Sequence, residues 1–155
     1  MDPLSISLAV ASLTFSFAKV TKCLFAIKDT YKNVPITVVS MIAECNTINL
    51  AFTHLQSLVQ KNPVALSSSF ISQDTLSKTF DDALTGCMFT SSAIERELKN
   101  LVEGEEGLGS IGFRARVGFI WDEDTMNHLL QHLRGQHTAV STLVTLLQTQ
   151  VSSIS

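Results

Sequence analysis

The 155-residue chain is apolar for its size, because hydrophobic residues make up 45% of it and charged residues only 16%. This composition excludes a disordered tail, and a net charge of −3 with a pI near 5.7 argues against a nucleic-acid-binding domain, which normally presents a basic surface. A mean hydropathy of +0.26 indicates apolar surface for a protein partner or a bilayer. The length is typical of one domain, and we assign residues 1–155 to it.

Residues 3–31 are predicted to form the first helix. Asp2 and Pro3 mark its start, because an aspartate can accept hydrogen bonds from the free amides of a first turn and a proline there loses none. Apolar side chains then recur at alternating spacings of four and three residues, which places them on one helix face. They are Ile6, Val10, Leu13, Phe17, Val20, Leu24, Ile27 and Tyr31.

Two further helices are predicted at residues 35–61 and 73–102, each with a similar apolar row. Proline at positions 35 and 63 separates the segments, and the serines at 67–69 predict a linker. Gly86 lies inside the third helix, where glycine costs about 1 kcal/mol relative to alanine. We therefore expect close contact with a neighbouring helix at Gly86, and a second close contact at Ser91, the one polar member of its row.

An acidic, glycine-rich loop is predicted at 103–112, followed by a short helix near 113–121 and a last main helix at 122–153. The last helix begins with three acidic residues, which suit the positive end of the helix dipole. Strand-type alternation is absent from the sequence. The prediction is an all-α fold, an antiparallel bundle of four main helices with one short helix.

Motifs for catalysis or cofactor binding lack the context that their chemistry needs. The glycines at 107, 109 and 112 match a dinucleotide-binding spacing, but a helix precedes them and the neighbouring glutamates would repel phosphate, so we expect no nucleotide. His128 and His132 lie four residues apart on one helix face, with Asp124 a further turn upstream. No cysteine is nearby in sequence and no H-E-x-x-H glutamate is present, so we expect no metal. No nucleophile motif is supported either. We predict a protein that is not an enzyme and has no cofactor.

The cysteines indicate a reducing compartment. Cys23, Cys45 and Cys87 are odd in number and have no paired spacing, and the last two fall on apolar rows, so buried, reduced thiols are expected. The first apolar stretch has no preceding basic residue and no clear cleavage site, which argues against a signal peptide. We predict a cytoplasmic protein with a membrane contact only on activation.

The N-terminal helix carries the candidate contact residues. Its uncharged part, residues 3–18, spans roughly 24 Å as a helix, short of a hydrocarbon core of roughly 30 Å, so only conditional insertion is expected. The candidate membrane or partner residues are Leu4, Ile6, Leu8, Val10, Leu13, Phe15, Phe17 and Val20. The candidate basic contacts are Lys19, Lys22, Lys28, Lys32, Arg114 and Arg116, and the candidate aromatic contact is Trp121.

Two stretches carry a family resemblance. They are the opening Met-Asp-Pro-Leu-Ser-Ile and the closing run from Trp121 through Leu129-Leu130 and Leu133-Arg134-Gly135-Gln136 to Leu147. They resemble the N-terminal domains of fungal NOD-like receptors and ankyrin-repeat proteins. The chain is also similar to the domain that opens azaphilone-pigment cluster proteins and, more distantly, to HeLo-like cell-death domains. The resemblance implies a helical signalling module ahead of a nucleotide-binding oligomerisation domain, with residues 4–20 as the helix that HeLo-like relatives expose to membranes.

Three functional hypotheses follow. The first is a regulatory module of an innate-immunity or incompatibility receptor, which recruits protein partners or self-associates through its helical surfaces. The second is a membrane-permeabilising effector that inserts residues 4–20 after release. The third is a stand-alone helical protein of a metabolic gene cluster that binds an apolar small molecule between its helices.

Overall fold

The computed structural model describes residues 2–30, 34–102 and 122–154, and all statements below concern these residues. They form helices α1 (Pro3–Thr30), α2 (Ile36–Lys61), α3 (Pro63–Ser72), α4 (Asp74–Val102) and α6 (Glu123–Ile154), with no strand among them. The predicted all-α fold is confirmed. The predicted short helix near 113–121 lies outside the described residues.

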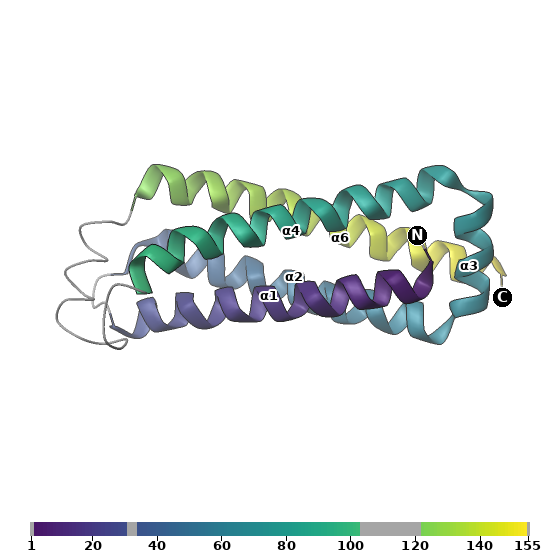
Figure 1. Ribbon diagram of the computed structural model, residues 1–155, viewed down its shortest axis with the longest axis horizontal. Coiled ribbons are helices and arrows are strands. Elements are labelled where there is room, and N and C mark those ends of the chain that lie inside the picture. Colours follow the sequence, from purple (N-terminus) through teal and green to yellow (C-terminus); the bar gives the residue numbers. More distant parts are fainter. Residues whose placement is uncertain (1, 31–33, 103–121, 155) are drawn as a thin grey trace.

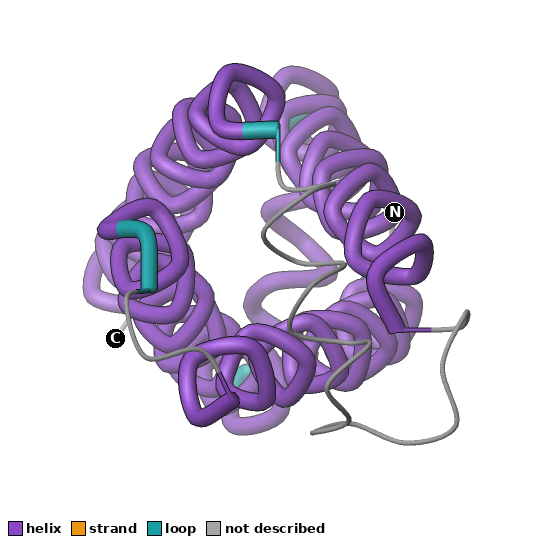
Figure 2. Tube along the Cα trace, turned by 90° about the vertical axis from the view of Figure 1, so that its left-hand side faces the viewer, coloured by secondary structure: helices purple, strands orange, loops and turns teal. Residues whose placement is uncertain are grey.

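Four long helices lie side by side, and α3 lies across one end of them (Figure 1). Seen along their length, the long helices surround a common centre (Figure 2). Helix α1 packs mainly against α2 and α4, and α6 packs mainly against the same two helices. The result is a helical bundle in which each long helix has two principal neighbours.

The predicted linker at 67–69 is wrong, because these serines lie inside α3. Pro63 occupies the start of this helix, where its fixed backbone angle favours helical geometry. Leu66 is fully buried, and the Ser69 hydroxyl donates a hydrogen bond of 3.2 Å to the Ala65 carbonyl oxygen one turn earlier. The Ser69 hydroxyl is thus satisfied within its own helix, and Leu66 packs into the core of the bundle.

The apolar row that the spacing predicted for the first helix lies in the core as far as it is described. On α1 the inner row, defined as Ile6, Val10, Leu13, Phe17, Val20, Leu24 and Ile27, is at most 5% exposed. At its centre the rings of Phe17 and Phe52 lie with their centroids 5.7 Å apart in a tilted arrangement, which aromatic pairs prefer. The α1–α2 contact is therefore an extended apolar interface with an aromatic pair in its middle.

Close contacts were expected for α4 at Gly86 and Ser91, and the structure shows a contact with another helix at Gly86. A methyl group built on Gly86 would lie 2.8 Å from Oε1 of Gln136 on α6, so glycine gives this side chain room at the α4–α6 interface. The contact predicted at Gly86 is confirmed. Ser91 is buried, and its hydroxyl donates at 3.2 Å to the Met88 carbonyl oxygen of the same helix.

An aspartate directly precedes each of α1 and α6, and its carboxylate accepts hydrogen bonding from the first turn of that helix. The backbone N–H of Ser5 donates to Oδ1 of Asp2 at 2.7 Å. For α6, Oδ1 of Asp122 accepts from the N–H groups of Asp124 at 3.1 Å and Thr125 at 3.3 Å. These contacts confirm the predicted start signal of the first helix and place an acid at the positive end of the last.

Replacing Phe17 by alanine should lower the free energy of unfolding by about 3–5 kcal/mol, because it leaves a cavity beside Phe52. The matched control is Phe15→Ala, two residues away on the exposed face of the same helix, which should cost less than about 1 kcal/mol. Urea unfolding followed by circular dichroism measures both. Equal losses for the two variants would contradict the assigned orientation of α1.

Thr125→Val should raise the pKa of Asp122. The Thr125 hydroxyl donates to Oδ2 of Asp122 at 2.8 Å, and this hydrogen bond is the largest cause that holds the pKa of the carboxyl below its ordinary value of 3.8. Because the folded-state pKa is lowered, the stabilisation by this cap is present above the unfolded-state pKa and is lost as the pH falls through the folded one. Carbon-13 NMR titration of the carboxyl measures the shift, and an unchanged pKa in the variant would refute the assignment.

Candidate functional site

The structure divides the eight predicted contact residues of α1 between two faces. Five of them belong to the inner row and are buried: Ile6, Val10, Leu13, Phe17 and Val20. The other three point away from the bundle, with exposures of 70% for Leu4, 65% for Leu8 and 68% for Phe15. Only these three are accessible to a partner while the bundle is folded.

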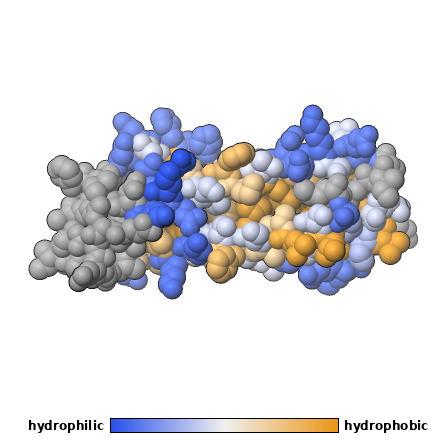
Figure 3. All heavy atoms as spheres, viewed as in Figure 1, coloured by the Kyte–Doolittle hydropathy of each residue, from blue (hydrophilic) through white to orange (hydrophobic). Residues whose placement is uncertain are grey.

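The exposed residues belong to a second row on the outer face of α1. The outer stripe comprises Leu4, Leu8, Ala11, Phe15, Ala18, Lys22 and Phe25, all of them exposed. Its spacings alternate strictly between four and three residues, as those of the inner row do, so it follows one face of the helix with a drift of about 20° every seven residues. Figure 3, which shows the side on which α1 and α4 lie, has hydrophobic patches at mid-length and towards the end at which α3 lies.

The predicted basic residues of α1 stand in its second half, around the outer stripe. Lys19 Nζ lies 2.9 Å from Oε1 of Glu95 on α4 and 5.8 Å from the ring centroid of Phe15. Lys28 Nζ lies 5.6 Å from the ring centroid of Phe25. Both side chains of the Lys19–Glu95 pair are about half exposed, so solvent screens the pair and it adds little stability. Two of the lysines therefore lie beside exposed rings, on a helix whose only charged side chain besides its lysines is Asp29.

The remaining predicted contacts, Lys32, Arg114, Arg116 and Trp121, lie outside the described residues. The sequence interpretation missed Phe25, which is 40% exposed and ends the outer stripe. The repeated four-and-three spacing from Leu4 onwards would have identified it. Exposed apolar side chains elsewhere were also missed, and they are Ile36, Val39, Leu50, Val64, Met88, Phe89 and Leu146.

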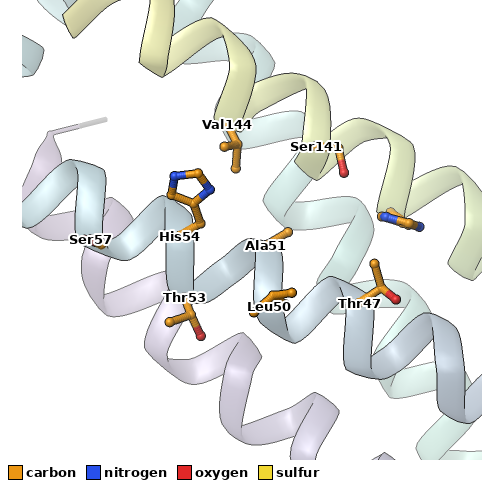
Figure 4. Close-up of a pocket in the computed structure, with 9 residues that line it drawn as sticks. Thr47, Leu50, Ala51, Thr53, His54, Ser57, Ser141 and Val144 are labelled. Atoms are coloured by element: carbon orange, nitrogen blue, oxygen red, sulfur yellow. The ribbon is translucent and has the colours of Figure 1, made fainter.

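An open groove of about 500 Å³ lies between α2 and α6. In Figure 4, His54 of α2 lies close to Val144 of α6, while Thr53 and Leu50 lie further from α6. The other lining residues are Thr47, Ala51, Ser57, His137 and Ser141. Hydroxyl groups and imidazoles thus share the groove with short apolar side chains.

Polar contacts join α2 and α6 around this groove. Nδ1 of His137 lies 3.0 Å from Oε2 of Glu44, whose other oxygen lies 3.8 Å from Nε of Arg134. Nε2 of Gln148 lies 3.2 Å from Nε2 of His54. Both imidazoles therefore have a polar partner on the facing helix.

The described residues contain no cluster of three or more metal-ligating side chains. Among the cysteines, Cys45 and Cys87 are buried, as predicted, and burial raises the pKa of each thiol to about 12. Cys23 is half-buried, and burial also raises its pKa. At neutral pH these thiols are protonated and poorly nucleophilic.

Two helices are long and apolar enough to cross a membrane. They are Pro3–Asp29, with a mean hydropathy of 1.5, and Ile36–Lys61, with 1.3. The buried shares of these segments are 28% and 39%, and core helices of proteins without a membrane span pass the same test. No protein-family model matches the chain, and no curated protein or solved structure matches it either.

Proposed function

We propose that the chain is a non-catalytic regulatory module, an antiparallel bundle of four main helices that recruits protein partners or self-associates through the outer stripe of α1. The observation that carries this proposal is the separation of the two apolar rows on one helix. The inner row supplies the core, while Leu4, Leu8 and Phe15 remain exposed although they are large and apolar. A contiguous exposed apolar row on a folded protein is typical of an interaction site.

The proposed setting is the one that the sequence resemblance implies. The module would lie in the cytoplasm, at the N-terminus of a fungal NOD-like-receptor-type protein, and would signal by association rather than by chemistry. The high pKa values of the buried thiols and the partnered imidazoles are consistent with a non-catalytic role. An interaction through the outer stripe has a further advantage, because it leaves the core intact.

The second candidate function, membrane attack of the HeLo-like type, is favoured by the hydropathy of α1. Membrane insertion needs more free energy than binding through the outer stripe, because α1 must first leave the core. Release of α1 removes seven inner-row side chains from the core, and at about 1.5–3 kcal/mol each this costs about 10–20 kcal/mol. A whole domain is typically stable by only about 5–15 kcal/mol. Insertion would therefore unfold the bundle unless a membrane or an activator repaid the cost.

The third hypothesis, an apolar small-molecule ligand between the helices, has weaker support. The α2–α6 groove is open, and its hydroxyls and imidazoles are better suited to polar contacts than to enclosing an apolar molecule.

A photo-crosslinking amino acid placed at Phe15 should capture protein in fungal cells, because this side chain points out from the centre of the stripe. The matched control carries the same group at Phe89 on α4, which is 70% exposed but lies outside the stripe. Mass spectrometry identifies the adducts. Protein adducts at position 15 and not at 89 are expected; lipid adducts alone, or equal capture at both positions, would contradict the proposed role.

The folded chain should not release dye from vesicles of phosphatidylcholine and phosphatidylserine, because the inner row of α1 stays in the core. Leakage that is lost in Leu13→Glu and Phe17→Glu would instead establish the second candidate function. Both substitutions bury a charge in the core, so circular dichroism must show whether each variant is folded. Phe15→Glu is the exposed control on the same helix.

A further inference from the structure

We propose that the partner of the outer stripe is a second copy of this chain, whose α1 packs antiparallel against the first across a two-fold axis beside Phe15. This inference rests on the proposed role of the outer stripe. It adds the identity of the partner, the direction of the two helices and the residue at the centre of the contact.

The spacing of the outer stripe is the one that helix pairs use. Seven positions from Leu4 to Phe25 alternate between steps of four and three residues, as the contact positions of a coiled coil do. Their length along the helix axis is about 32 Å, which is long enough for a stable helix pair. The bundle already uses the same spacing on the inner row, so the outer face repeats the geometry with which α1 packs inside the molecule.

The order of side-chain sizes along the stripe is nearly the same from either end. Phe15 stands at the centre, Ala11 and Ala18 flank it, longer side chains follow on each side, and Leu4 and Phe25 end the stripe. A two-fold interface requires such a surface, because each patch must be complementary to itself. Antiparallel pairing brings the two Phe15 rings together beside the axis, and the small alanines allow the helices to approach closely.

The charges distinguish antiparallel from parallel pairing. Residues 3–18 are uncharged, whereas Lys19, Lys22 and Lys28 all lie in the second half of the helix, where Asp29 is the one acid. Parallel pairing would place each Lys22 against Lys22 of the partner copy. Antiparallel pairing places the lysine half of one helix against the half that begins with the exposed Asp2 carboxylate, and it also aligns the helix dipoles favourably.

A groove at the N-terminal end of α1 offers a recess for the partner copy. It has a volume of about 440 Å³ and is lined by Asp2, Pro3 and Leu4 of the α1 end and by Pro63, Val64, Ser67 and Ser68 of α3. With the axis beside Phe15, position 25 of the partner copy lies opposite position 5, next to Leu4. Phe25 of the partner copy then faces the exposed apolar groups of Leu4 and Val64, while Lys28 beside that ring faces Asp2. The groove therefore places apolar groups and one carboxylate opposite the far end of the stripe.

Sedimentation velocity on the full chain tests the proposal. The wild type should be a dimer at about 100 μM, and Phe15→Glu should weaken the dimer by at least about 100-fold, because two carboxylates would meet beside the axis. Phe89→Glu is the matched control, since Phe89 is as exposed as Phe15 but lies on α4, and it should leave the dimer intact. Circular dichroism should show unchanged folding in both variants. Leu8→Glu serves as a second stripe variant if Phe15→Glu is unfolded.

Pulsed electron resonance tests the direction of the helices. A spin label attached through Lys28→Cys in a Cys23→Ser background should give a label separation of about 40 Å in the dimer, because position 28 then lies opposite position 2 of the partner copy. Parallel pairing would bring the labels to about 10 Å. The longer distance supports the proposal and the shorter one overturns it.

Every other outcome is decisive as well. A monomeric wild type overturns the proposal, and so does a dimer that survives Phe15→Glu or is lost in Phe89→Glu. A monomer that binds the vesicles through Phe15 would assign the stripe to a lipid surface instead. If the wild type is monomeric but still crosslinks another protein from position 15, the proposed interaction role stands and only self-association is refuted.

Discussion

The packing of the α1 inner row against α2 and α4 is the contact on which the rest of the structure depends. Seven side chains from Ile6 to Ile27 enter the core, and the Phe17–Phe52 pair stands at their centre. Burial of these side chains fixes which face of α1 points into the bundle. Because the opposite face must then point away from the bundle, Leu4, Leu8 and Phe15 are exposed. The exposed stripe therefore follows from the way the core is packed.

This arrangement separates buried from exposed apolar side chains within one helix. Substitutions on the inner row remove core contacts, while substitutions on the outer stripe leave the core intact. Neighbouring positions such as Phe15 and Phe17 therefore lie on different faces although both are phenylalanine. The lysines differ in the same way. Lys19 contacts Glu95 of α4, whereas Lys22 lies within the exposed stripe.

Much of the fold could be predicted from the sequence, because the long helices carry regular apolar rows and end near proline or acidic residues. The predicted bounds of the four main helices differ from the observed ones by no more than one residue. The short helix α3 was missed, because three consecutive serines resemble a linker and a helix of 10 residues is too short for a long apolar row. Local sequence does not reveal that the end of a bundle needs covering.

The candidate site was only partly predictable for a different physical reason. Helix α1 is apolar on both faces, so composition alone cannot tell which face enters the core, and Ile6 and Leu8 received the same assignment. Partners across helices were also beyond the sequence, because the Glu44–His137 contact joins residues that lie far apart in the chain. The room that Gly86 leaves for Gln136 was the exception, since an unfavourable residue inside a helix signals a contact even when its partner is unknown.

A cysteine scan along α1 in a Cys23→Ser background, with the rate of thiol alkylation measured in the native protein, tests the division between the two faces most directly. In protein diluted well below the concentration at which two copies would pair, fast alkylation is expected at positions 4, 8, 11, 15 and 18 and slow alkylation at 6, 10, 13, 17 and 20. Uniform rates along the helix, or fast alkylation at the second set of positions, would contradict it.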